Sequence, residues 1–321
     1  MRKIVVLDGF AMNPGDLSWE PLERLGTLVR HDRTAPHETY QRCEGAFAIL
    51  TNKVVIDKDL ICRLAPTLRY IGVTATGYNV VDTDAAREAG ICVTNIPAYS
   101  THAVAQMVMA HLLAMCNHVE HYSRQVCEEG KWTSSKDFCY TDLPLKELYG
   151  HTIGIVGLGA IGMAVAHIAQ AFGMKVTAYT SKPQEALPPF ITPCSMEALC
   201  AQSDVVSLHC PLTPDTYHLV STAWLAQMKE GSILINTGRG PLVDEHAVAA
   251  ALHSGHLGAY CADVLSEEPA RADNPLLSAP RVQLTPHIAW ATQEARQRLL
   301  NCCADNLAAF IQGKPTNIVN K

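Results

Sequence analysis

One stretch of the chain, residues 151–182, constrains its fold more than any other. It contains the glycine pattern GLGAIG at residues 157–162, which lies between an apolar β-rich run (152–156) and a segment rich in helix formers (163–172). A second β-rich run (175–179) follows. This order predicts a strand, a tight turn, a helix and a further strand, which is the setting in which a GxGxxG pattern binds a dinucleotide.

Each glycine of the pattern has a physical role in such a site. Gly157 permits the tight turn, Gly159 lets the backbone approach a pyrophosphate, and Gly162 lets the helix pack close to the strand. The helix start at Ala160 and Ile161 offers unpaired N–H groups and the positive end of the helix dipole to the phosphates. Three glycines also suit an ordinary tight turn, but the flanking strand, helix and strand favour the dinucleotide site.

Composition limits the classes of protein to which the chain can belong. A length of 321 residues suggests about two domains. The net charge is −6 and no basic block is present, so nucleic acid is not an expected partner. The first apolar run is too short for a signal peptide and no run approaches a membrane span, which predicts a cytoplasmic protein without a membrane partner. The twelve cysteines form no CxxC pair and the histidines lack zinc-binding spacing, so we expect reduced thiols and no metal site.

The rest of the chain alternates predicted strands with predicted helices, which indicates parallel sheets covered on both faces. One long, mostly apolar helix is predicted from Ser100 or Thr101 to about Val126, as a crossover between domains or part of a subunit interface. The segment 183–193 reads as a proline-rich loop, and a terminal helix at 292–312 could return to the first domain. The predicted strands are 4–7, 46–50, 68–73, 91–95, 205–210, 232–237, 259–264 and 282–284, and the other predicted helices are 18–25, 57–64, 82–89, 221–228 and 244–253.

Three predicted strand ends carry residues with catalytic potential. Arg239 follows one strand, Asp263 and Glu268 follow the next, and His287 follows the last. Taken singly, each residue could have no functional role. Arg239 could be a surface cation, Glu268 a solvated loop acid, and His287 a histidine whose hydrogen bonds are satisfied in a turn. Ligands of parallel α/β sheets bind beside the carboxyl ends of the strands, so their joint position beside a nucleotide site favours a functional role.

Taken together, these motifs resemble those of the D-isomer-specific 2-hydroxyacid dehydrogenases over essentially the whole length of the chain. The resemblance is strongest to the glycerate dehydrogenase/hydroxypyruvate (glyoxylate) reductase branch. Two departures are Ala289-Trp290, where Gly-Ser is common, and Gln106, where Glu is usual. The first places substrate identity in doubt. The matching segments are ATGYN (75–79), GLGAIG (157–162), HCPLT (209–213), NTGRG (236–240), DVLSEEP (263–269) and PHI (286–288).

The resemblance implies an NAD(P)-dependent oxidoreductase acting on CH–OH groups and a set of catalytic residues. Arg239 would hold the substrate carboxylate and polarise the 2-oxo group, and backbone N–H groups around Thr76 and Gly77 would bind the same carboxylate from the other domain. His287 would donate a proton to the carbonyl oxygen during hydride transfer. Glu268 would pair with His287, and a carboxylate beside an imidazole favours the charged imidazole. The substrates implied are hydroxypyruvate or glyoxylate, reduced to D-glycerate or glycolate.

The resemblance also implies a domain plan. The predicted fold class is α/β with two Rossmann-like or flavodoxin-like domains, in which the cofactor domain is inserted into the substrate domain. Residues 1–99 and 291–321 would form the substrate-binding (catalytic) domain, and residues 100–290 the NAD(P)-binding Rossmann domain. A homodimer is the oligomer that the family suggests.

The cofactor is expected to be NAD(P)(H), with use of both forms and a preference for NADP(H). An NAD-specific site places Asp or Glu at the end of the second strand, but Thr180-Ser181-Lys182 stands there and no carboxylate appears until Glu185. Hydroxyls and a cation suit a 2′-phosphate, although the loop could be merely solvated and both cofactors bind. The expected cofactor-binding residues are Thr76, Gly157, Gly159, Ala160, Ile161, Gly162, Thr180, Ser181, Lys182, His209, Cys210, Pro211, Thr237, Gly238, Asp263 and His287.

A second class of function shares this fold. Some relatives act as NAD-sensing corepressors, in which the nucleotide fold is a binding module with little turnover. Because such proteins also keep the Arg, Glu and His set, only turnover separates the two. Formate dehydrogenases are disfavoured, since that branch has Gln where this chain has Glu268.

Overall fold

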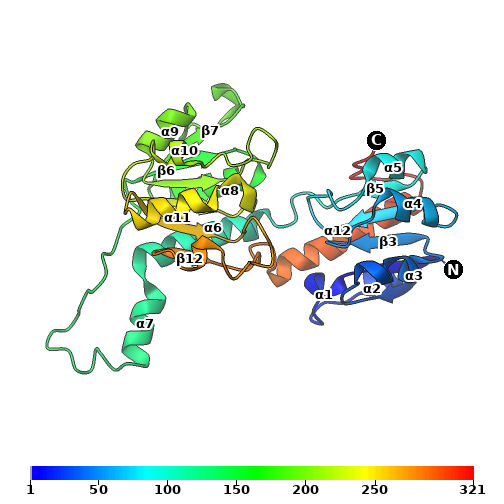
Figure 1. Cartoon of the computed structure of the whole chain (residues 1–321), viewed down its shortest axis with the longest axis horizontal. Coiled ribbons are helices and arrows are strands. Elements are labelled where there is room, and N and C mark those ends of the chain that lie inside the picture. The colour runs from blue at the N-terminus through cyan, green and yellow to red at the C-terminus, as the bar shows by residue number, and fades with distance from the viewer. Residues whose placement is uncertain (1) are drawn as a thin grey trace. The chain divides into compact units, whose positions relative to one another are not determined.

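The computed structural model describes residues 2–321 and divides into two compact α/β units (Figure 1). Unit 1 comprises the described residues up to Ser100 together with Trp290–Lys321, and unit 2 comprises Thr101–Ala289. Unit 2 therefore interrupts unit 1 in the sequence. Both units contain parallel sheets, which confirms the predicted fold class.

Unit 1 is built on a five-stranded sheet in the order β2-β1-β3-β4-β5, in which every neighbouring pair is parallel. The central strands β3 and β4 are buried along their whole length, as expected for a sheet covered on both faces. The strands are β1 (Lys3–Val6), β2 (Thr27–Arg30), β3 (Ala48–Thr51), β4 (Tyr70–Val73) and β5 (Cys92–Thr94).

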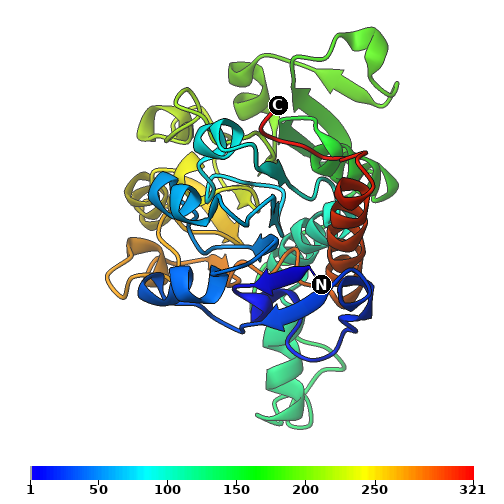
Figure 2. The same cartoon turned by 90° about the vertical axis from the view of Figure 1, so that its right-hand side faces the viewer.

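Helices cover both faces of the unit 1 sheet. On one face α4 and α5 begin at capping aspartates, because Asp57 accepts from Leu60 N (2.9 Å) and Asp82 from Ala85 N (2.9 Å). On the other face lies the C-terminal helix α12, capped by Thr292, and the last residues (red in Figure 2) return to β5. The helices are α1 (Gly9–Met12), α2 (Glu20–Glu23), η1 (Pro36–Glu38), α3 (Thr39–Cys43), α4 (Lys58–Leu64), α5 (Thr83–Glu88) and α12 (Gln293–Ile311).

Unit 2 is built on a seven-stranded sheet in the order β12-β11-β10-β9-β6-β7-β8, again parallel throughout. The chain starts at β6, runs outward through β7 and β8, and then crosses to β9 on the other side of β6. This reversal between β6 and β9 is the point at which doubly wound sheets bind nucleotides. The strands are β6 (Thr152–Val156), β7 (Lys175–Tyr179), β8 (Ile191–Pro193), β9 (Val205–Leu208), β10 (Ser232–Asn236), β11 (Leu257–Ala262) and β12 (Val282–Leu284).

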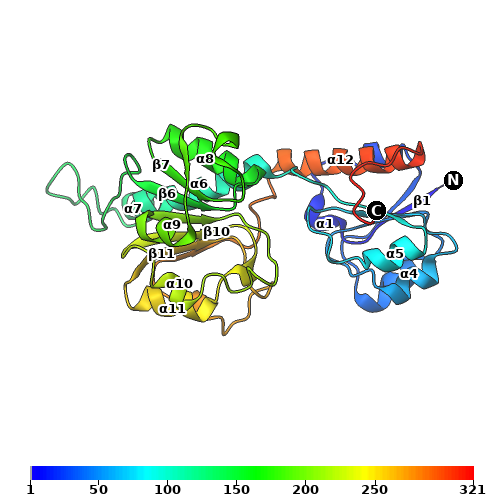
Figure 3. The same cartoon turned by 90° about the horizontal axis from the view of Figure 1, so that it is seen from above.

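Alternate residues of the unit 2 strands enter two separate cores. One core lies under α6 and α8 and the other under α9, α10 and α11, and Figure 3 shows α6 and α8 on the opposite face to α10 and α11. Ile233 and Ile235 of β10 point to the first core, whereas Leu234 points to the second. The helices are α6 (Thr101–Asn117), α7 (Val119–Cys127), α8 (Ala160–Ala171), η2 (Gln184–Ala186), α9 (Met196–Gln202), α10 (Thr222–Leu225), η3 (Gly240–Leu242), α11 (Glu245–His253) and η4 (Pro275–Leu277).

Two predicted segments differ from the structure. The single long helix to Val126 is wrong, because His118 adopts a left-handed conformation (φ 50°) that ends α6 and starts α7 in a new direction. The predicted loop at 183–193 contains the short strand β8, which pairs with β7 at the edge of the sheet. Its proline at position 193 is tolerated at an edge. Within residues 2–321, no helix is long and apolar enough to cross a membrane.

Candidate active site

The glycine pattern forms the turn between β6 and α8. Gly157 has φ +92°, and a Cβ there would lie 2.6 Å from the backbone nitrogen of Cys210, so the turn lies directly against the end of β9. A Cβ on Gly162 would overlap the carbonyl oxygen of Gly157, which explains why the first turn of α8 needs glycine. The left-handed turn and the close packing therefore both require glycine.

Gly159 differs from the other two glycines because nothing in the protein lies near it. A Cβ there would meet no atom within 4 Å, and Gly159 caps α8 without a side-chain hydrogen bond. The first N–H groups of α8, which start at Ala160 and Ile161, therefore face open space. At the end of β10, which is two strands from β6 in the sheet, the buried hydroxyl of Thr237 has no partner among the described residues. An open helix start and an unpartnered hydroxyl at the carboxyl edge fit a bound dinucleotide.

The segment after β9 borders the same turn. His209 Nε2 lies 2.8 Å from the Ser207 hydroxyl, and burial lowers the pKa of His209 to about 4, so its imidazole is neutral near neutral pH. Burial also raises the pKa of the Cys210 thiol, which keeps it protonated, and Pro211 is exposed. These residues therefore border the glycine turn with neutral groups.

The end of β7 carries the residues expected to select the cofactor. Thr180 is half-buried and its hydroxyl accepts from Lys182 N (3.2 Å), which orders the turn. Lys182 is exposed, and its ammonium has no hydrogen-bond or ion-pair partner among residues 2–321. The first acidic side chain after the strand, Glu185, lies on η2.

Arg239 stands at the end of β10 on a loop that is held closely in place. Asn236 bonds the loop twice, donating to Arg239 O (2.9 Å) and accepting from Gly238 N (3.1 Å). A Cβ at Gly240 would overlap the backbone of Leu265, so the Arg239 loop packs directly on the segment that leads to Glu268. The Arg239 side chain itself is exposed, and its one hydrogen bond to the described residues is to Gly238 O (2.8 Å).

Glu268 and His287 form a charged pair at this edge of the unit 2 sheet. His287 Nδ1 lies 2.6 Å from Glu268 Oε2, and the two side chains are 31% and 33% exposed. Glu268 Oε1 accepts from Leu265 N (3.1 Å), which orients the carboxylate toward the ring. His287 Nε2 has no hydrogen-bond partner among residues 2–321, so one ring nitrogen is oriented and the other is open.

Asp263 lies at the end of β11 and is 1% exposed. Its carboxylate accepts from Thr285 Oγ1 (2.5 Å), Ile288 N (2.9 Å) and Ala289 N (2.8 Å). In the structure this carboxylate holds the segment on both sides of His287, and the cofactor contact that the resemblance implies for Asp263 stays a prediction. His111, which the sequence reasoning missed, extends this arrangement, because its Nε2 lies 3.2 Å from Thr285 Oγ1. The signal in the sequence was a histidine surrounded by apolar residues in the middle of α6.

Thr76 and Gly77 belong to unit 1, in the loop after β4. The Thr76 hydroxyl donates to Ile96 O (3.0 Å) and Asn95 Nδ2 donates to Thr76 O (2.7 Å), so the loop is tied to the segment after β5. The backbone N–H groups of Thr76 and Gly77 have no acceptor within the part of the chain that the structure describes. They are therefore available to an anion.

Comparison with known proteins agrees with this geometry. Residues 109–289 match the family described as "D-isomer specific 2-hydroxyacid dehydrogenase, NAD binding domain". Hydroxypyruvate reductase of Blautia hydrogenotrophica is 46% identical over 99% of this chain and 100% of its own length. The TT0316 protein of Thermus thermophilus is 36% identical, with a TM-score of 0.86 over 99% of this chain and 100% of that one. An acyclic imino acid reductase solved with NADPH and D-Arg is 29% identical, with a TM-score of 0.84 over 99% of both chains.

A parallel sheet with a glycine turn at its switch point defines a dinucleotide-binding fold, and the matched family description specifies NAD binding. The family match, and the sequence identity to a relative over nearly the whole chain, identify the family within this class of proteins. The chain belongs to the D-isomer specific 2-hydroxyacid dehydrogenase family, which confirms the resemblance in its motifs.

Proposed function

We propose that this protein is an NAD(P)-dependent D-2-hydroxyacid dehydrogenase that interconverts a small 2-oxo acid and its D-2-hydroxy acid. Hydroxypyruvate or glyoxylate would be reduced to D-glycerate or glycolate. The observation that carries the proposal is the 2.6 Å pair of His287 and Glu268 at the carboxyl edge of the dinucleotide-binding sheet. The 46% identity to a hydroxypyruvate reductase over 99% of the chain supports the substrate class. The relatives named above as reductases favour turnover over a binding module.

The proton step falls to His287. Its Nδ1 is occupied by Glu268, so Nε2 is the nitrogen that donates to the carbonyl oxygen during reduction and accepts the proton during oxidation. Glu268 stabilises the protonated ring and fixes its orientation. The nicotinamide, when bound, supplies or accepts the hydride.

The substrate carboxylate would be bound by cationic and backbone donors. The planar guanidinium of Arg239 suits both oxygens of a carboxylate and would also polarise the 2-oxo group. Unit 1 is proposed to be the substrate-binding domain, through the open N–H groups of Thr76 and Gly77. Unit 2 contains the matched NAD-binding region and is proposed to hold the cofactor on Gly159, Thr237 and their neighbours.

A substrate panel tests this function directly. Purified protein is assayed with NADH and NADPH against hydroxypyruvate, glyoxylate, pyruvate and bulkier 2-oxo acids. The highest kcat/KM is expected for hydroxypyruvate or glyoxylate. A clear preference for a bulky 2-oxo acid would contradict the proposed substrate class while leaving the reaction type intact.

NADP(H) is proposed as the preferred cofactor because of the end of β7. Thr180, Ser181 and Lys182 offer two hydroxyls and an unpaired ammonium to a 2′-phosphate, and no carboxylate stands there to repel it. The likeness to a reductase solved with NADPH supports the same preference.

Thr180→Asp is expected to lower the ratio of kcat/KM for NADPH to that for NADH by about tenfold or more, since one close like-charge pair is worth at least ~1.4 kcal/mol in such a site. The ratio is measured on one substrate in both variants. Thr180→Asn is the matched control because it has the same shape as the aspartate without the charge. An unchanged ratio in Thr180→Asp would show that the strand end does not contact the ribose.

A homodimer is proposed, with α7 and the following loop as the contact region. This arm projects from the sheet of unit 2 (Figure 1) and exposes large apolar side chains, with Phe138 at 88%, Val119 at 66% and Trp132 at 52%. Exposed apolar groups gathered on a projection favour a protein partner.

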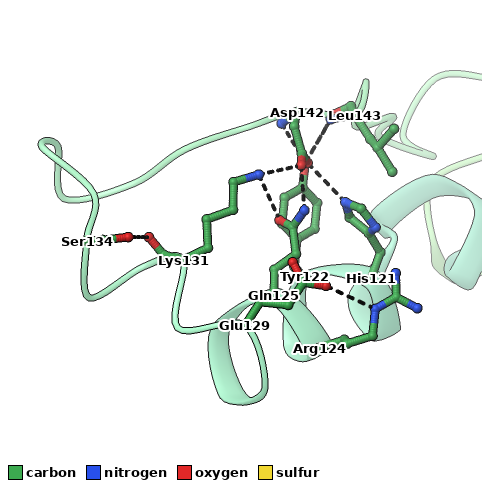
Figure 4. A network of polar contacts seen from close by, with 9 residues as sticks. All are labelled: His121, Tyr122, Arg124, Gln125, Glu129, Lys131, Ser134, Asp142 and Leu143. Atoms are coloured by element: carbon green, nitrogen blue, oxygen red, sulfur yellow. Dashed lines mark hydrogen bonds and ion pairs between the residues drawn. The ribbon is translucent and has the colours of Figure 1, made fainter.

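The arm is ordered by its own polar network (Figure 4). Asp142 accepts from Lys131 Nζ (2.7 Å) and Gln125 Nε2 (2.7 Å) and pairs with His121 Nε2 (3.1 Å). The Lys131 ammonium and the Gln125 amide hold the pKa of Asp142 well below its usual range. The network joins the loop to α7, so the apolar side chains are presented on a formed surface.

Phe138→Ser is expected to raise the dissociation constant of the dimer by about tenfold or more, as for loss of an interface anchor. Molar mass is measured by light scattering over a dilution series. Val55→Ser, an exposed apolar residue of unit 1 (62% exposed), is the control. Equal molar mass for both variants at every concentration would exclude Phe138 from the interface.

A further inference from the structure

His287 is held in an unfavourable backbone conformation. Its φ is 55°, in the left-handed region, which is sterically unfavourable for a residue with a Cβ. Such a conformation persists only where surrounding contacts impose it. The two N–H groups that follow His287, those of Ile288 and Ala289, both end on the carboxylate of Asp263 (2.9 and 2.8 Å). The position of His287 therefore depends on the orientation of Asp263.

The orientation of Asp263 depends in turn on Thr285. An ionised carboxylate only accepts hydrogen bonds, so the Thr285 hydroxyl must donate to Asp263 Oδ1 across their 2.5 Å contact. A hydroxyl has one proton, so the same oxygen is left to accept from a third group. That group is His111, whose Nε2 lies 3.2 Å away.

His111 is fixed as a donor by its surroundings. It is 2% exposed in α6, among the apolar residues of the first unit 2 core, and burial lowers its pKa below the usual range. The ring is therefore neutral near neutral pH, and the Thr285 contact requires its proton on Nε2. The three side chains form one directed chain of hydrogen bonds, from His111 to Thr285 to Asp263.

We propose that His111 and Thr285 are positioning residues for His287, acting through the Asp263 carboxylate. This inference rests on the proposed role of His287 as proton donor. Without the Thr285 hydroxyl, the remaining donor to Asp263 Oδ1 among the described residues is Ile288 N, which belongs to the segment that the carboxylate holds. The carboxylate then loses its anchor outside that segment, and the segment carrying His287 is free to leave its left-handed conformation. Small misplacements of a reacting group cost up to about 10²-fold in rate. The effect should fall on kcat and leave cofactor affinity unchanged.

The test compares Thr285→Val, which keeps the shape and removes the hydroxyl, with Thr285→Ser, which keeps the hydroxyl. Thr285→Val is expected to lower kcat for hydroxypyruvate reduction by about 10–100-fold, and Thr285→Ser to stay within about threefold of the unmodified protein. The Kd for NADPH, from fluorescence titration, should be unchanged in both. His111→Leu and His111→Gln form a second pair, in which Gln restores a donor, and it serves if Thr285→Val does not fold.

A double-mutant cycle separates this inference from the function on which it rests. If Thr285 acts through His287, Thr285→Val should have no further effect on the residual rate of His287→Ala. An equal loss in both backgrounds, or full activity of Thr285→Val, would overturn the positioning role. If His287→Ala alone retains the normal rate, the proposed function fails, and it fails independently of Thr285.

Discussion

His287→Ala is expected to lower kcat for reduction of hydroxypyruvate by about 10²–10⁴-fold, the usual value of one positioned proton donor. The Glu268 carboxylate lies 2.6 Å from His287 Nδ1 and orients the ring. His287 Nε2 has no hydrogen-bond partner among residues 2–321 and can face a substrate. Steady-state kinetics with saturating cofactor measure the change. Because the ring is removed and the backbone is kept, the Kd for the cofactor should change little.

The control for this prediction is His246→Ala, which removes an exposed histidine from α11 of the same unit. It should leave the rate unchanged. Turnover of His287→Ala close to that of the His246→Ala control would remove His287 from the proton-transfer step.

Arg239→Ala is expected to lower kcat/KM for the 2-oxo acid by about 10³-fold or more, with a higher KM and a lower kcat. The guanidinium is proposed to contribute to ground-state binding through the carboxylate and to the transition state through the carbonyl oxygen. It is exposed at the end of β10 with one bond to its own loop, so its loss should not unfold the protein.

Arg239→Lys is the informative partner of this variant. Lysine keeps the charge but loses the planar fork, so it should restore part of the binding and little of the rate. If Arg239→Ala retains the KM of the unmodified protein, the substrate carboxylate is bound elsewhere.

The parts of the fold that follow from local chemistry could be predicted from the sequence. The sequence correctly predicts Gly157 in a turn and Gly162 in the helix that follows, because a left-handed residue and a close helix contact both need glycine. Strands such as β6 and β7 coincide with their apolar runs. The pairing of Glu268 with His287, suggested by the family motifs, has the expected geometry in the structure.

The parts that depend on tertiary contact could not be predicted. The break at His118 leaves no mark in composition, because histidine is acceptable in a helix and only its left-handed φ of 50° ends α6. Strand β8 is three residues long and includes a proline, so pairing with β7 and not propensity creates it. The contact between His111 and Thr285 joins residues 174 positions apart, and no local pattern reports such a distance.

The central claim is most directly tested by turnover with product analysis. Purified protein is incubated with hydroxypyruvate and NADPH or NADH, cofactor oxidation is followed by absorbance, and the product is resolved on a chiral column. The Kd for each cofactor is measured in parallel. We predict rapid cofactor oxidation that yields D-glycerate in equal amount, with higher efficiency for NADPH. Tight cofactor binding without turnover of any 2-oxo acid, or formation of the L-isomer, would contradict the account.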